Sequence, residues 1–139
     1  MVMLCTRRPH ERTDAAPFLK WAGGKSQLLA SILPRLPTKI RTYYEPFIGG
    51  GAVFFSLARE LRFSNAVLAD RNPSLVEAYR TVRDDVEALV DALASHARHA
   101  TSPEYFYELR GMDGATWSSV ERTARLLYHD LTLPELRPL

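Results

Sequence analysis

The chain has 139 residues, of which 46% are hydrophobic and 24% are charged. This length suits one compact domain, and the composition excludes disorder over most of the chain. No apolar run approaches the roughly 20 residues of a membrane span, and the lone Cys5 excludes an internal disulfide and a cysteine-based zinc site. We therefore expect a cytoplasmic protein with no membrane partner and no metal.

Charge is distributed unevenly, although the formal net charge is only +2. Residues 1–41 carry eight Lys or Arg and two acidic residues, a net charge of +6, and residues 42–139 carry −4. A basic first third suits a phosphate-bearing or polyanionic partner. A solvated basic tail accounts for the same distribution, and charge alone favours the tail.

The first half of the chain shows alternating helical and extended patterns. Residues 1–16 are polar and charged without a period, so we expect a flexible leader, with structure beginning at Pro17. Apolar spacing predicts a short helix over 26–33, and residues 42–44 form a β-favouring run. The apolar residues of 52–61 cover most of a helix circumference, which predicts a buried helix.

The second half reads as one strand followed by helices. The apolar run at 65–69 predicts a buried parallel strand. Asn72 as N-cap and Pro73 at the first helical position begin an amphipathic pattern that extends to about His96, with a break near 84–85. Further helices are expected over 103–110 and 117–128, followed by a divergent tail at 129–139 without a clear period.

The order of the predicted elements indicates the fold class. A strand, a glycine-rich turn, a helix, a second strand and an acidic residue form the first part of a doubly wound α/β fold. Such sheets usually have about five strands or more, and only two are visible in this sequence. We therefore expect an α/β fold that is truncated at its C-terminal side.

The glycine turn at 47–51 is the strongest candidate for a ligand site. Glycines leave no Cβ in the way, and the helix that follows offers free backbone N–H groups. Asp70 stands 21 residues after Gly49, at the carboxyl end of the next strand. Because adjacent parallel strands bring these ends together, we expect Asp70 beside the turn, where its carboxylate can accept hydrogen bonds from ribose hydroxyls.

The turn matches neither of two common nucleotide-binding motifs. The nicotinamide fingerprint requires a third glycine where Phe54 stands, and the Walker loop requires a glycine where Leu19 stands. An acidic residue, Pro and Phe at the end of a strand, followed by Gly-x-Gly, instead suit S-adenosylmethionine. This cofactor has ribose hydroxyls and a zwitterionic methionine but no pyrophosphate.

Three segments together resemble the motifs of one enzyme family. They are Phe18–Lys25 (FLKWAGGK), Tyr44–Phe55 (YEPFIGGGAVFF) and Leu68–Leu75 (LADRNPSL). In this order they are similar to the Dam-type (D12 class) site-specific DNA adenine-N6 methyltransferases, and weaker similarity continues to residue 128. The resemblance implies a Rossmann-like, S-adenosylmethionine-dependent methyltransferase fold. It places the cofactor-binding part over 17–100 and the start of the target-recognition region over 101–128.

The resemblance also implies a set of cofactor-binding residues: Trp21, Lys25, Glu45, Phe47, Gly49, Gly51 and Asp70. Lys25 is expected to pair with the methionine carboxylate of the cofactor, and Glu45 with its ammonium group. Trp21 and Phe47 are expected to line the same pocket. Without the resemblance, Trp21 suits plain core packing and Lys25 suits a surface position at the start of a helix.

The sequence departs from the family at its catalytic motif. Such enzymes hold the amino group of a flipped adenine with an Asp/Asn-Pro-Pro-aromatic tetrapeptide, and none of the 139 residues supplies one. We therefore identify no catalytic residue. We expect the N-terminal, cofactor-binding part of such an enzyme, truncated before the catalytic tetrapeptide. Three interpretations stay open: an adenine-specific methyltransferase acting on double-stranded DNA, an inactive remnant, and one half of a split enzyme completed by a C-terminal half.

Overall fold

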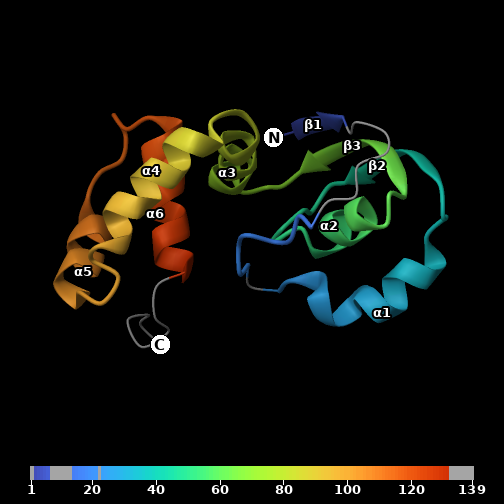
Figure 1. Cartoon of the computed structure of the whole chain (residues 1–139), viewed down its shortest axis with the longest axis horizontal. Coiled ribbons are helices and arrows are strands. Elements are labelled where there is room, and N and C mark those ends of the chain that lie inside the picture. The colour runs from blue at the N-terminus through green and yellow to red at the C-terminus, as the bar shows by residue number, and fades with distance from the viewer. Residues whose placement is uncertain (1, 7–13, 22, 132–139) are drawn as a thin grey trace. The chain divides into compact units, whose positions relative to one another are not determined.

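The computed structural model describes residues 2–6, 14–21 and 23–131 (Figure 1). The chain divides into two compact units, residues 1–76 and 77–139, and the division falls inside α3 (Pro73–Asp84). The functional boundary that the sequence predicts at residue 100 is a different division, and it stays a prediction.

The first unit is built on a three-stranded sheet in the order β1–β3–β2. β2 (Ile40–Glu45) and β3 (Phe63–Ala69) run parallel, with Glu45 opposite Leu68. The helix α2 (Ala52–Arg59) connects them, so the predicted order of strand, turn, helix and strand is confirmed. Parallel pairing brings the carboxyl ends of β2 and β3 to the same edge of the sheet.

At the start of the segment 1–16, for which the sequence predicts a flexible leader, the structure has a strand. β1 (Val2–Thr6) pairs antiparallel with β3, with Val2 opposite Ala69, and Met3 is buried. Five residues are too few to show a convincing period, and the residues with which they pair lie 59 to 67 positions away in the chain. Residues 14–16 are irregular and exposed, and residues 7–13 lie outside the described part of the chain.

The core of the first unit lies between α2 and one face of the sheet. Every residue from Ala52 to Ala58 is buried, which confirms the predicted buried helix. Phe54 stacks on Phe63 with ring centroids 5.5 Å apart, and Tyr43 stacks on Phe63 at 6.0 Å. This packing holds both parallel strands against the helix that begins at the glycine turn.

The opposite face of the sheet carries exposed apolar side chains. The register places Tyr44 opposite Val67 and Val2 opposite Ala69, so these four residues share that face. Val2 is 55% exposed and Tyr44 is 68% exposed. Sheets with parallel strands are ordinarily covered on both faces, so this face is the one on which further structure would pack.

The helix predicted over 26–33 is present as three short turns. They are the 3₁₀ turn η1 (Lys25–Leu28), the α-helical turn α1 (Leu29–Ile32) and the 3₁₀ turn η2 (Leu33–Arg35). Pro34 lies in the last turn, and the segment ends within two residues of it.

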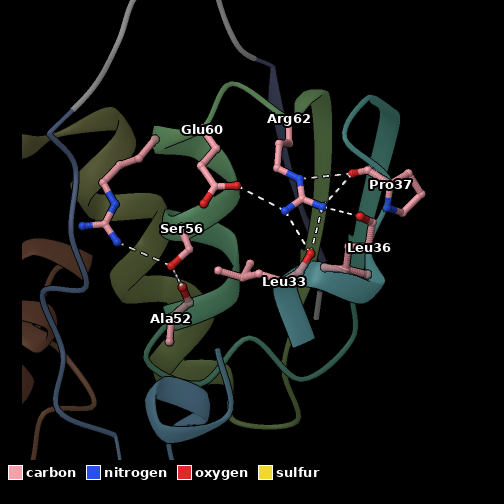
Figure 2. A network of polar contacts seen from close by, with 8 residues as sticks. Leu33, Leu36, Pro37, Ala52, Ser56, Glu60 and Arg62 are labelled. Carbon is pink, nitrogen blue, oxygen red and sulfur yellow. Dashed lines mark hydrogen bonds and ion pairs between the residues drawn. The ribbon is translucent and has the colours of Figure 1, made fainter. Parts of the chain in front are cut away.

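Arg62, just before β3, ties the end of this helical segment to the sheet (Figure 2). Its guanidinium donates to the carbonyl oxygens of Leu33 at 3.1 Å, of Pro37 at 2.9 Å and of Leu36, and it pairs with Glu60 at 3.1 Å. One planar guanidinium thus contacts three carbonyl oxygens at the end of this segment and in the turn that follows it.

We expect Arg62→Lys to lower the free energy of unfolding by about 1.5–3 kcal/mol, because an ammonium group cannot span the same carbonyls. Urea unfolding measures this loss. Arg41→Lys makes the same change at an exposed residue of β2 and should stay within about 0.5 kcal/mol of wild type. Equal effects of the two substitutions would contradict the structural role of Arg62.

The second unit contains the end of α3, α4 (Val86–Ala97), α5 (Pro103–Gly111) and α6 (Ser119–Leu131). The predicted break at 84–85 is confirmed, with Asp85 at the N-cap of α4. α6 continues to Leu131, three residues into the segment predicted to lack a helical period, and residues 132–139 lie outside the described part. No described helix is long and apolar enough to cross a membrane.

Aromatic side chains fill the core of the second unit. Phe106 and Tyr128 are buried there, and Tyr105 and Trp117 pack against them. The ring of His129 meets Phe106 edge-on at 4.6 Å, and burial together with nearby Arg side chains lowers the pKa of this imidazole to about 4. These aromatic groups serve the packing of the helices.

Candidate cofactor site

The glycine turn lies at the edge where β2 and β3 end. The backbone N–H of Ile48 donates to the carbonyl oxygen of Ala69 at 3.0 Å, and that of Gly49 donates to Oδ2 of Asp70 at 3.1 Å. Oδ1 of Asp70 accepts from the N–H of Asn72 at 2.9 Å. The predicted position of Asp70 beside the turn is therefore confirmed, and its role toward a ligand stays a prediction.

The geometry of the turn constrains both Gly50 and Gly51. Gly51 precedes the first residue of α2 with a φ of +79°, in the left-handed region that disfavours side chains. A Cβ atom at Gly50 would lie 2.9 Å from the carbonyl oxygen of Leu19, closer than side chains pack. The close approach of Gly50 to Leu19 joins the turn to the segment that carries Trp21.

Trp21 lies against the turn and is half-buried. A Cβ atom at Gly49 would stand 3.5 Å from Cδ1 of Trp21, and one at Gly50 would stand 3.6 Å from its Cβ. The neighbouring Leu19 is fully packed in the core, whereas Trp21 keeps part of its surface open. Trp21 is therefore in contact with the turn without being fully buried in the core.

Lys25 and Glu45 form an ion pair at the end of β2. Nζ of Lys25 lies 3.0 Å from Oε1 of Glu45 and also donates to the carbonyl oxygen of Phe47. Glu45 is only 5% exposed, while Lys25 is partly exposed. The hydroxyl of Tyr43 donates to Oε2 of Glu45 at 2.9 Å, so each carboxylate oxygen has its own donor.

The pKa of Tyr43 is raised above its ordinary value, first by burial and then by the negative charge of Glu45. The phenol therefore keeps its proton throughout the neutral range and acts as a hydrogen-bond donor. Tyr43 and Gly50 are absent from the residues that the sequence predicts for the site. The signal for Tyr43 was its position two residues before Glu45, because alternate residues of a strand share a face.

The structure brings most of the predicted residues to one place. The contacts given above join four of them to the turn that contains Gly49 and Gly51: Trp21, Lys25, Glu45 and Asp70. Phe47 contributes its carbonyl oxygen to Lys25, but its side chain is 70% exposed. Among the described residues, no three His, Cys, Asp or Glu side chains gather as a metal ion would require.

Comparison with known proteins places the chain in a family. The profile described as "D12 class N6 adenine-specific DNA methyltransferase" matches residues 21–135. The chain belongs to this family. The resemblance that the three sequence segments indicate is therefore confirmed.

Curated relatives agree with this assignment. The chain is 44% identical to the Type II methyltransferase M1.LlaDCHI of Lactococcus lactis subsp. cremoris, over 84% of this chain and 41% of that protein. It is 38% identical to the Type II methyltransferase M.MjaIII of Methanocaldococcus jannaschii, over 70% and 37%. It is 36% identical to a DNA adenine methylase of Haemophilus influenzae, over 81% and 38%. The chain thus spans about two fifths of the length of these relatives.

We expect Gly50→Ala to destabilise the turn by about 1–3 kcal/mol, because the added methyl group meets backbone that cannot move cheaply. Urea unfolding and faster amide exchange at Gly49 measure the effect. Gly111→Ala is the matched control, since the space around Gly111 is open and its φ is not positive. An unchanged exchange rate at Gly49 in the Gly50 variant would contradict the close approach.

Proposed function

We propose that this chain is the cofactor-binding part of an adenine-specific DNA methyltransferase and that it binds S-adenosylmethionine at the glycine turn. The observation that carries this proposal is the convergence of the buried Glu45, its partner Lys25 and Asp70 on one turn. These residues lie within the matched region of the family. The family reaction is transfer of the cofactor's activated methyl group to N6 of adenine in double-stranded DNA.

The charges of the site suit the methionine end of this cofactor. A methionine zwitterion presents an ammonium group and a carboxylate, which complement Glu45 and Lys25. When the zwitterion binds, each side chain exchanges its present partner for a ligand group of opposite charge. No buried charge is then left unpaired, and an unpaired buried charge is the arrangement that costs most.

The turn and Asp70 suit the ribose. The two N–H groups that Asp70 accepts from orient its carboxylate at the edge of the turn, and a carboxylate accepts hydrogen bonds from hydroxyl groups. The glycines let a ligand approach the backbone closely. The site lacks the third glycine that would favour a pyrophosphate, which supports S-adenosylmethionine over a dinucleotide.

We expect Lys25→Met to abolish selectivity for the cofactor's carboxylate. Wild type should bind S-adenosylmethionine about tenfold or more tightly than its decarboxylated form, because a charge-assisted bond is worth about 1.5–3 kcal/mol. The variant should bind both forms equally, as isothermal titration calorimetry can show. Lys39→Met, at an exposed position, is the control and should keep the preference. A Lys25 variant that also kept it would remove Lys25 from the site.

Catalysis requires groups that these 139 residues do not contain. The amino group of adenine is a poor nucleophile, because its lone pair is delocalised into the ring. Acceptors of an Asp/Asn-Pro-Pro-aromatic motif orient it, and such positioning is worth several powers of ten in rate. Glu45 and Asp70 lie at the proposed cofactor site and cannot take this role.

We propose that a second polypeptide supplies the catalytic part that this chain lacks. An exposed face of the sheet supports this proposal. The sheet face of Tyr44 and Val2 is exposed, and in the three-stranded sheet β2 pairs only with β3. A complementing C-terminal half would cover this face and supply the missing motif. The basic residues of 1–41, with a net charge of +6, would support contact with DNA phosphates. An inactive remnant is the alternative.

We expect the chain alone to transfer no tritiated methyl group from S-adenosylmethionine to adenine-containing duplex DNA above an Asp70→Ala control. Co-expression with the remaining C-terminal part of the Lactococcus relative should restore transfer, because that part contains the region which this chain lacks. Transfer by the chain alone would refute the need for the missing motif. A complex that forms and stays inactive would favour the inactive remnant.

A further inference from the structure

We infer that Tyr43 is a positioning residue of the proposed cofactor site, whose hydroxyl holds the carboxylate of Glu45 in place to receive the cofactor's ammonium group. This inference rests on the proposed function. Tyr43 precedes the segment Tyr44–Phe55 that carries the family resemblance, and the turn itself does not contain it.

Glu45 has two hydrogen-bond donors of different character. Lys25 binds Oε1 at 3.0 Å, but it is partly exposed, belongs to a short 3₁₀ turn and also contacts the carbonyl oxygen of Phe47. Tyr43 binds Oε2 at 2.9 Å from the same strand. When Lys25 turns to a ligand carboxylate, Tyr43 is the donor that stays on Glu45.

The core of the first unit fixes the ring of Tyr43. The ring stacks on Phe63 with an interplanar angle of 23°, and Phe63 stacks on Phe54 of α2 at 27°. Ala66, opposite Tyr43 in the register, is fully buried. A donor held by packed rings keeps one direction, and a site built on such elements is more accurate than one built on loops.

The protonation state of Tyr43 agrees with this role. Burial and the nearby charge of Glu45 both raise its pKa, so the phenol donates a hydrogen bond and does not compete as an anion. A carboxylate that is 5% exposed needs such donors to remain an acceptor for an incoming ammonium group. Tyr43 thereby orients Glu45 without touching the ligand itself.

The first test compares two ligands on the full chain. Tyr43→Phe removes only the hydroxyl, and calorimetry measures binding of S-adenosylhomocysteine and of its deamino analogue, which keeps the carboxylate but lacks the ammonium group. We expect affinity for S-adenosylhomocysteine to fall about fivefold or more and affinity for the analogue to stay unchanged. Equal losses for both ligands would overturn the inference, because a merely structural role weakens both.

Tyr44→Phe is the matched control for this experiment. It makes the same chemical change one residue later, on the opposite face of the sheet, where Tyr44 is 68% exposed. Affinity for both ligands should match wild type. A Tyr44 variant that reproduced the selective loss of the Tyr43 variant would also overturn the assignment.

A ligand-free measurement separates this inference from the proposed function. Urea unfolding of Tyr43→Phe, Glu45→Gln and the double variant forms a double-mutant cycle. We expect Tyr43→Phe to shift the unfolding midpoint less in the Glu45→Gln background, because the partner charge is gone. Additive shifts would refute the positioning contact. Failure of wild type to bind either ligand would refute the cofactor site, while the cycle would still decide the role of Tyr43.

Discussion

The parallel pairing of β2 with β3 is the constraint on which the candidate site depends. It brings Glu45 at the end of one strand and Asp70 after the other to the same edge, where the glycine turn crosses between them. The bond from Gly49 N–H to Asp70 joins the two strand ends directly. Antiparallel strands would have placed the two carboxylates at opposite edges, and no common site would have formed.

Balanced charge is the second property that organises the site. A buried carboxylate is tolerated here because Lys25 and Tyr43 each satisfy one of its oxygens. In the proposed function this arrangement suits a zwitterion, because the ammonium group of Lys25 and the neutral hydroxyl of Tyr43 share one carboxylate. In the proposed complex, binding exchanges partners and leaves no buried charge unpaired, which keeps its electrostatic cost low.

The proposed function separates cofactor binding from the chemistry on adenine. The residues of the proposed cofactor site come from the end of β2, the glycine turn, the residue after β3 and the segment that carries Trp21 and Lys25, all within the first unit. The family reaction also needs groups that hold the flipped base. In our proposal, these groups belong to structure that packs on the exposed face of the sheet. The chain spans about two fifths of the length of its relatives, and the cofactor-binding part of the reaction is the part that we propose for it.

Local features determined what the sequence could predict. Residue type, helix caps and hydrophobic period predict three features: the glycine turn, the interval between Gly49 and Asp70, and the break before α4. β1 was missed because five residues show no period, and a strand obtains its hydrogen bonds from a distant partner, here β3. Gly50 is constrained by the carbonyl oxygen of Leu19, and the ring of Tyr43 is held by Phe63. Both partners are far away in the chain, so only tertiary packing brings these pairs together.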